Sequence, residues 1–214
     1  METFNQIKNE IIAQVQGGLA SDESKFDDTM VESLINQARA DLVYPRRTLP
    51  EVFYQPIELQ YISKVNAFNN CYVEFLMPMP LTFANNTDGI RYLGHPSGDV
   101  AYSRRGKSTT SSIYMAHKLI RNKTETMWVA TMDTIGQWRV KVYNNPDVEE
   151  LLVIGAFYNP IQVPNFRKDV DPYPIDGDTL SDVKRAINQI MMQQQQIMPN
   201  VVSTDLDKTA APRR

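Results

Sequence analysis

Apolar residues near the N-terminus recur at steps of three and four positions. Phe4, Ile7, Ile11 and Val15 follow this spacing, which places them on one face of an amphipathic helix. The pair Gly17-Gly18 comes directly after the pattern, and glycine is unfavourable inside a helix. The sequence therefore predicts a short first helix that buries one face and ends before the two glycines.

A second helix is marked by its charged start and by an apolar repeat of four residues. Asp27 and Asp28 supply an N-terminal cap and a negative charge where the helix dipole favours one. The predicted apolar stripe comprises Met30, Leu34, Ala38 and Leu42, widened by Val31 and Ile35. Pro45 ends the helix, because the residue before a proline resists helical geometry. Residues 1–50 are therefore expected to form a hairpin of two antiparallel helices.

From about residue 51 the pattern changes to short runs that are typical of strands. The runs that predict strands are 57–62, 71–77, 90–93, 100–103, 127–132, 138–143 and 151–157. Clusters of Asn, Gly, Asp and Pro separate these runs, and no strand–helix–strand alternation occurs. Residues 51–164 are therefore expected to form a β-rich core. Within it, residues 113–121 fit a strand or one helical turn equally well.

A third helix is predicted near the C-terminus, after an irregular connector that contains Pro and Asp at 165–175. The helix begins near Asp178, carries an apolar stripe and ends at Pro199. Its stripe comprises Val183, Ile187, Ile190 and Met191. Residues 200–214 have no aromatic side chain and few apolar ones, so we expect a flexible tail.

Together these patterns predict an α+β fold in one compact domain. It consists of two N-terminal helices, a central antiparallel β-sheet or sandwich, a connector and C-terminal helix at 165–199, and an extended tail.

Composition narrows the function classes. The chain has 214 residues, a net charge of −3, one Cys and two His. These counts exclude a disulfide framework and a Cys/His metal cluster within one chain. The N-terminal residues lack the features of a secretory signal, and the longest apolar run, 151–157, is too short to cross a bilayer. We expect a soluble protein without membrane contact, in which Cys71 is a small buried hydrophobe.

Residues with catalytic or metal-binding chemistry are few. His95 and His117 have serines nearby in sequence, but no nucleophile motif surrounds them. The five aspartates from Asp169 to Asp182 lack the spacing of a calcium loop, and Asp176 or Asp178 is expected to cap the third helix instead. The sequence therefore predicts no enzyme activity, no catalytic residue, no metal and no cofactor.

One charged segment stands out. Between residues 104 and 123 there are six basic residues and no acid, namely Arg104, Arg105, Lys107, Lys118, Arg121 and Lys123. Such a segment can contact nucleic acid without sequence preference, pair with acidic patches of a neighbouring subunit, or form a solvated loop. The acidic patches are residues 22–28 and 169–182. The overall net charge of −3 favours pairing between subunits over a protein built mainly to hold DNA.

Two local motifs, together with the order of the elements, resemble a known family. Leu151–Pro160 reads as a strand that ends in Gly-x-Phe-x-x-Pro, and Asp171–Ile175 contains a Tyr-Pro-Ile entry into the last helix. These features are similar to those of the head-to-tail connector proteins, also called adaptor or neck-ring proteins, of short-tailed, crAss-like bacteriophages.

The resemblance implies a structural virion protein that forms a ring between the portal and the tail. It implies a homo-oligomer, a dodecamer by this resemblance, with the portal and other neck or tail proteins as partners. It also implies assembly in the host cytoplasm and a place in the neck of the virion. Non-specific contact with the genomic DNA is a further expectation.

Two other function classes stay open at this stage. A ligand- or carbohydrate-binding β domain of a tail or surface protein would present aromatic rings on a concave face. Trp128 and Trp138 lie in strand-like runs, where packing in the core is the expected role. A hydrolase with carboxylate chemistry would need Glu58 and Glu74 to face each other across neighbouring strands.

Overall fold

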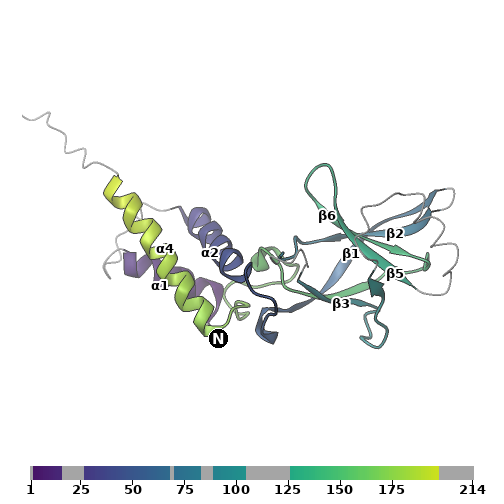
Figure 1. Cartoon of the computed structure of the whole chain (residues 1–214), viewed down its shortest axis with the longest axis horizontal. Helices are drawn as coiled ribbons and strands as arrows, with labels where there is room; N and C mark the ends of the chain where they lie inside the picture. The colour runs from purple at the N-terminus through teal and green to yellow at the C-terminus, as the bar shows by residue number, and fades with distance from the viewer. Residues whose placement is uncertain (1, 16–26, 68–69, 83–88, 105–125, 198–214) are drawn as a thin grey trace, which may run out of the picture.

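The computed structural model is an elongated body with helices at one end and strands at the other (Figure 1). The structure describes residues 2–15, 27–67, 70–82, 89–104 and 126–197. The predicted α+β fold is confirmed: two N-terminal helices precede a curled, mostly antiparallel seven-stranded sheet, and a C-terminal helix follows it.

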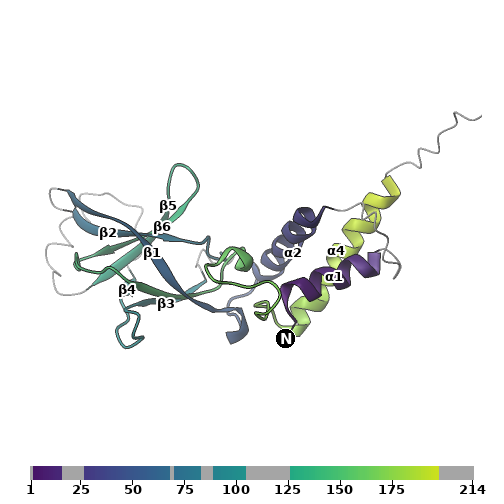
Figure 2. The ribbon, with the colours of Figure 1, turned by 180° about the vertical axis from the view of Figure 1, so that it is seen from behind.

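Three α-helices form one end of the body. They are α1 (Phe4–Val15), α2 (Asp28–Val43) and α4 (Gly177–Ile197). Helix α4 packs against both of the others and most extensively against α2 (Figure 2). The predicted N-terminal cap is confirmed, because the side chain of Asp27 accepts a hydrogen bond from the backbone N–H of Thr29 at 3.2 Å. The C-terminal helix thus completes a three-helix layer with the two N-terminal ones.

The buried face of α2 is centred differently from the prediction. Val31, Ile35 and Val43 are fully buried, whereas the predicted stripe of Met30, Leu34, Ala38 and Leu42 is only partly buried at the edge of this core. The centre of the face also contains the polar residues Asn36 and Arg39. A search for apolar positions alone passes over these two residues and therefore misplaces the centre.

Two further burial predictions are wrong. Cys71 is exposed, because it is the second residue of the strand Asn70–Met77, in which Val73 is the first residue described as buried. In α4, Val183, Ile187 and Met191 are fully buried as predicted, but Ile190 is 38% exposed. Ile190 lies one position before Met191 and so points about 100° away from the buried line of the helix.

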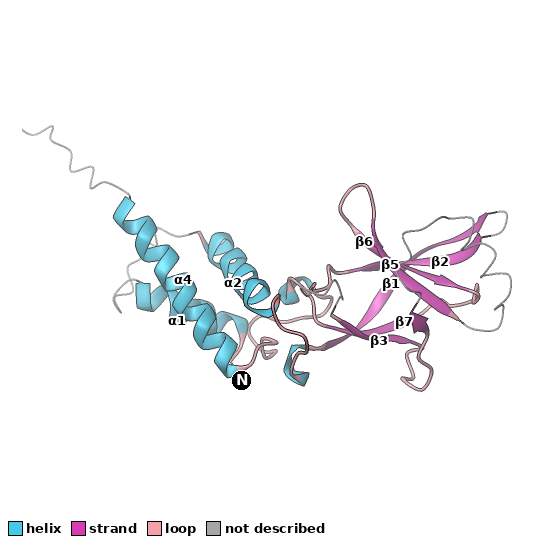
Figure 3. Ribbon diagram, in the orientation of Figure 1, coloured by secondary structure: helices cyan, strands magenta, loops and turns pink. Residues whose placement is uncertain are grey.

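The seven strands form one sheet. This sheet lies at the other end of the body (Figure 3). They are β1 (Gln55–Ala67), β2 (Asn70–Met77), β3 (Ile90–Gly94), β4 (Ser103–Arg104), β5 (Met127–Met132), β6 (Trp138–Tyr143) and β7 (Leu151–Gly155). Their order is β3-β7-β1-β2-β6-β5-β4, and every neighbouring pair is antiparallel except β4–β5.

The long strand β1 explains the curl of the sheet. Its first part, from Gln55 to Leu59, pairs with β7, and its second part, from Gln60 to Ala67, pairs with β2. The register shifts between Tyr61 and Ser63, and such irregularities bend a strand and increase its twist. The two parts of the sheet therefore fold toward each other and share one hydrophobic core.

The strand predictions hold except at three places. The predicted run 57–62 is part of the longer strand β1, which continues to Ala67. Of the run 100–103 only Ser103 lies in a strand, while Ala101 makes an isolated bridge to Gly94. The run 151–157 ends as a strand at Gly155, after which Ala156 donates its backbone N–H to the carbonyl of Gly89 at 2.9 Å. The ambiguous run 113–121 and the predicted tail 200–214 lie outside the described residues.

Two hydrophobic cores follow from this arrangement. One core lies among the helices and the other lies inside the curled sheet. Phe157 belongs to the sheet core, while the neighbouring Ala156 and Tyr158 pack with the helical core. The segment after β7 therefore lies where the two cores meet. None of the described helices combines the length and the apolar character that a membrane span requires.

Candidate functional site: the junction between helices and sheet

A fully buried arginine lies between the two cores. Arg39 of α2 has no exposed surface. Its Nε donates to the carbonyl oxygen of Pro174 at 2.9 Å, and its Nη1 donates to that of Phe157 at 2.9 Å. These carbonyls belong to the entry into α4 and to the end of the β7 segment. One side chain thus binds α2 to both ends of the segment that connects β7 with α4.

Aromatic rings flank the guanidinium of Arg39. Its Cζ lies 5.3 Å from the ring centre of Phe53 and 5.6 Å from that of Tyr173, within cation–π range. Burial lowers the pKa of Arg39, an effect that Tyr173 partly opposes, and burial raises the pKa of Tyr173 to about 12. Among the described residues, the hydrogen bonds of Arg39 go to backbone carbonyls, and its Nη2 has no hydrogen-bond partner. Two carbonyl dipoles and two ring faces therefore stabilise the positive charge of Arg39 in place of a carboxylate.

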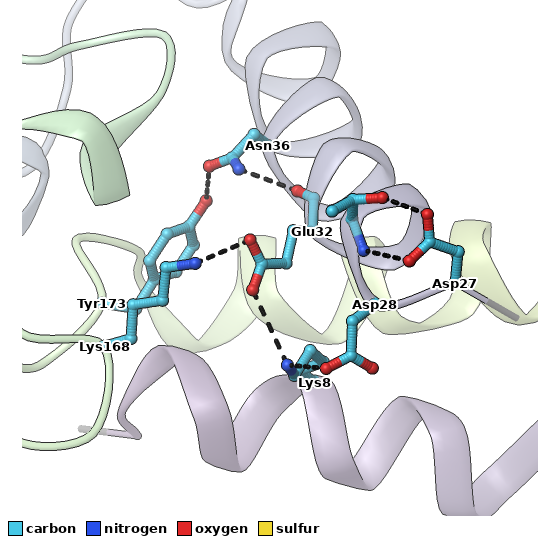
Figure 4. Close-up of polar contacts among 8 residues, drawn as sticks. Lys8, Asp27, Asp28, Glu32, Asn36, Lys168 and Tyr173 are labelled. Atoms are coloured by element: carbon cyan, nitrogen blue, oxygen red, sulfur yellow. Dashed lines mark hydrogen bonds and ion pairs between the residues drawn. The ribbon is translucent and has the colours of Figure 1, made fainter. Parts of the chain in front are cut away.

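Polar contacts extend from this junction to α1. The hydroxyl of Tyr173 donates to Oδ1 of Asn36 at 2.9 Å, and Nδ2 of Asn36 donates to the backbone carbonyl of Glu32 at 2.8 Å (Figure 4). The carboxylate of Glu32 lies between two lysines, with Lys168 Nζ at 2.7 Å and Lys8 Nζ at 3.6 Å. The segment before α4 is thereby attached to α2, and α2 is attached to α1.

Another arginine, Arg46, lies in the segment after α2 and binds the start of α4. Arg46 forms an ion pair with Asp176 at 3.0 Å and donates to Oγ1 of Thr179 at 2.6 Å. Asp176 also accepts the backbone N–H of Thr179 at 2.7 Å, so it caps α4 as one of the two residues predicted for that role. Burial alone would raise the pKa of Asp176, but the bonds from Thr179 and Arg46 outweigh burial and lower it.

Replacing Asp176 by alanine is expected to lower the free energy of unfolding by about 1 kcal/mol at neutral pH, because a helix cap is lost. A carboxyl whose pKa is lowered by folding stabilises fully above its unfolded pKa of about 3.9 and loses this effect as pH falls through the folded value. Urea denaturation at a series of pH values should therefore show the difference shrinking in acid. Asp178→Ala is the control, since Asp178 is exposed and should contribute only a few tenths of a kcal/mol through the helix dipole.

An open pocket of about 420 Å³ lies beside the junction. Three chain segments line it: 52–56 before and within β1, 163–166 after the short 3-10 helix Pro160–Gln162, and 171–174 before α4. Its apolar wall includes Tyr54, Pro56, Pro164, Phe166 and Pro172. The pocket is therefore a mainly apolar hollow in which aromatic rings and prolines predominate.

Of the six basic residues predicted as an interface or DNA-channel segment, the structure describes Arg104. It is exposed on β4, and its guanidinium lies 5.2 Å from the ring centre of Trp128. The other five, Arg105, Lys107, Lys118, Arg121 and Lys123, lie outside the described residues.

Several acids proposed as their partners are occupied within the chain. Asp27 caps α2, and the remaining pairs are Asp28 with Lys8, Asp171 with Arg167, Asp176 with Arg46, and Asp182 with Arg185.

The other residues considered for catalysis do not come together in one site among the described residues. The ring Nδ1 of His95 lies 3.0 Å from Oγ of Ser97 in an exposed turn, and His117 lies outside the described residues. Glu58 is exposed on β1 opposite Leu152, whereas Glu74 on β2 lies opposite Ser63 and pairs with Arg139 and Lys141. The two carboxylates therefore do not face each other. In the described part of the chain, no group of three or more His, Cys, Asp or Glu has the geometry to hold a metal.

The two tryptophans do not form an exposed binding face together. Trp128 is 4% exposed, and its Nε1 donates to the backbone carbonyl of Tyr102 at 3.0 Å, so its predicted core role is confirmed. Trp138 is half-buried at the edge of the same core.

Sequence reasoning missed Arg39. One signal was present: Ile35, Arg39 and Val43 are spaced by four, so the arginine occupies the buried line of α2. Comparison with known proteins adds no assignment, since neither a protein family model nor a curated protein matches the chain.

Proposed function

We propose that the protein is a structural subunit of a phage head-to-tail connector and that it forms a ring between the portal and the tail. The observation that carries this proposal is that both motifs behind the family resemblance contact the side chain of Arg39. The Gly-x-Phe-x-x-Pro motif supplies the carbonyl of Phe157, and the Tyr-Pro-Ile motif supplies the carbonyl of Pro174 and the ring of Tyr173. These motifs therefore act as structural joints.

The shape of the subunit supports the same role. A ring subunit that spans a joint between two assemblies needs two ends held in a fixed relation, and it needs large interfaces rather than an active site. In the junction, Arg39 binds the carbonyl of Phe157, a residue of the sheet core, while further hydrogen bonds join α2 and the segment after it to the entry into α4. By contrast, a carbohydrate-binding domain would present its tryptophans, and Trp128 is in the core.

Electron microscopy of the purified protein and of its parent particle tests the proposal. We expect a closed ring of identical subunits that is coaxial with the portal. A protein that stays monomeric over a wide concentration range and occupies no position in the neck would contradict the proposal. The same images give the number of subunits in the ring, which we propose to be twelve.

The double variant Arg104→Gln with Arg105→Gln tests how the basic segment acts. Since most described acids of the two acidic patches already have partners within the chain, we expect rings to form normally at low and at high salt in sedimentation experiments. Arg185→Gln, which removes an exposed arginine elsewhere, serves as the control. Loss of rings in the double variant alone would favour pairing between subunits, whereas normal rings with altered genome retention would favour contact with DNA.

A further inference from the structure

The hairpin between β5 and β6 ends in a turn that is held in one shape. Oδ1 of Asp133 accepts the backbone N–H of Ile135 at 3.0 Å and that of Gln137 at 2.8 Å, while Oδ2 accepts Nε of Arg139 at 2.9 Å. Gly136 has a positive φ of 82°, which glycine adopts without strain. The hairpin stands out from the body of the protein (Figure 1). Its tip is therefore ordered in advance of any contact.

This ordered tip exposes two large apolar side chains. Ile135 is 73% exposed and Met132 is 61% exposed, the highest values for large apolar residues in the described part of the chain. A single exposed apolar side chain is normal on a protein surface. Here one of them is on a turn that an aspartate fixes, and the other is the last residue of the strand that leads into it. Such an arrangement suits a contact element, since a rigid element loses little entropy on docking.

The pocket at the junction has complementary properties. Its volume of about 420 Å³ falls within the range of pockets that bind compact apolar groups, and its wall is built mainly of aromatic rings and prolines. Gln55, which lines it, has a buried Oε1 without a hydrogen-bond partner among the described residues. No residue of the hairpin tip lines the pocket of its own chain.

We propose that the β5–β6 tip inserts Ile135 and Met132 into the junction pocket of a second copy of this chain. The two surfaces are different, so the contact is head-to-tail, and it repeats from copy to copy until the ring closes. The closed form of the assembly rests on the proposed connector function, whereas the contact itself rests on the tip and the pocket. The contact places each tip against the joint that holds the neighbour's two ends together.

Sedimentation of three forms of the full chain tests the contact. We expect the wild-type protein to assemble and Ile135→Asp to associate at least ten-fold more weakly, because a charged group enters the apolar pocket. Val100→Asp is the matched control, since Val100 is 54% exposed in another turn and should tolerate the change with normal assembly. Circular dichroism confirms that each variant is folded.

Cross-linking identifies the two surfaces directly. In a Cys71→Ser background, which removes the exposed native thiol, one preparation carries Ile135→Cys and another carries Pro164→Cys. Mixing the two under oxidising conditions should give a disulfide-linked dimer that contains one chain of each kind, well above the dimer formed by either preparation alone. A link of this kind can only be intermolecular.

The outcomes separate this contact from the connector function. If the wild-type protein assembles while Ile135→Asp assembles equally well and no mixed dimer forms, the contact is overturned and the ring stands. If the wild-type protein never associates, both are overturned. If truncation after Asn200 abolishes assembly while Ile135→Asp does not, residues beyond Asn200 carry the assembly contact, and the hairpin contact is again overturned.

Discussion

Replacing Arg39 by alanine is expected to lower the free energy of unfolding by about 3–5 kcal/mol, at the high end for a single substitution. The change leaves the buried carbonyls of Phe157 and Pro174 without their donors, and each unsatisfied buried group costs about 1–3 kcal/mol. It also opens a cavity between the rings of Phe53 and Tyr173. Removing the buried charge of Arg39 is favourable, but this gain offsets only part of the loss in stability. Urea denaturation, monitored by circular dichroism, measures the effect.

Two conservative variants of Arg39 identify which property of the side chain matters. Arg39→Met keeps most of the volume and removes the buried charge, so its loss is expected to be smaller than that of the alanine variant. Arg39→Lys keeps a charge but places one compact ammonium where a planar fork now reaches two carbonyls, so it should also destabilise the protein. Wild-type stability in Arg39→Met would show that the two hydrogen bonds make no net contribution, and it would contradict our account of the junction.

Local signals explain how much of the fold the sequence predicts. The cap at Asp27, the apolar line Phe4–Ile7–Ile11–Val15 and the strand β5 each depend on neighbours within a few residues. A pattern of period 3.6 or 2 therefore places these elements correctly. It fails where burial depends on position in the assembled fold, as at Cys71 near the start of β2.

The junction could not be predicted for the opposite reason. Arg39 meets Phe157 and Pro174 across 118 and 135 residues of sequence, and Asn36 meets Tyr173 across 137. No periodicity within α2 reports such partners. Arginine is rarely fully buried, so the spacing from Ile35 through Arg39 to Val43 would ordinarily be explained as a break in the apolar stripe. Only the folded structure shows that Arg39, at this position, binds the segment between β7 and α4.

The predicted basic segment shows a different limit. Charge density along the chain selects residues by type, and it gives no information on which acids are already paired. Asp28, for example, is held by Lys8 in α1, 20 residues away, and Asp176 is held by Arg46, 130 residues away. An unbalanced charge run therefore predicts an interface only after the internal pairs have been subtracted.

The second large effect is expected at Phe157, where the same residue serves both cores. Its ring is fully buried in the sheet core and packs closely on Gly155, while its carbonyl accepts from Arg39 of the helical core. Phe157→Ala should therefore lower the free energy of unfolding by about 3–5 kcal/mol through the cavity that it leaves. Tyr158→Ala, at the next and only half-buried position, is the control and should cost less.

A double-mutant cycle decides whether the two cores are coupled through this residue. If the ring of Phe157 fixes the carbonyl that Arg39 binds, then losing the ring already weakens that bond. The double variant Phe157→Ala with Arg39→Ala should then cost less than the sum of the single variants, by about 0.5–3 kcal/mol. The pair Phe75→Ala with Arg39→Ala shares no partner among the described residues, and its effects should add. An osmolyte such as trimethylamine N-oxide keeps the double variants folded enough to measure. Additive effects in both pairs would mean that the ring and the carbonyl act independently, and that the helical and sheet ends are joined by separate contacts rather than through one rigid residue.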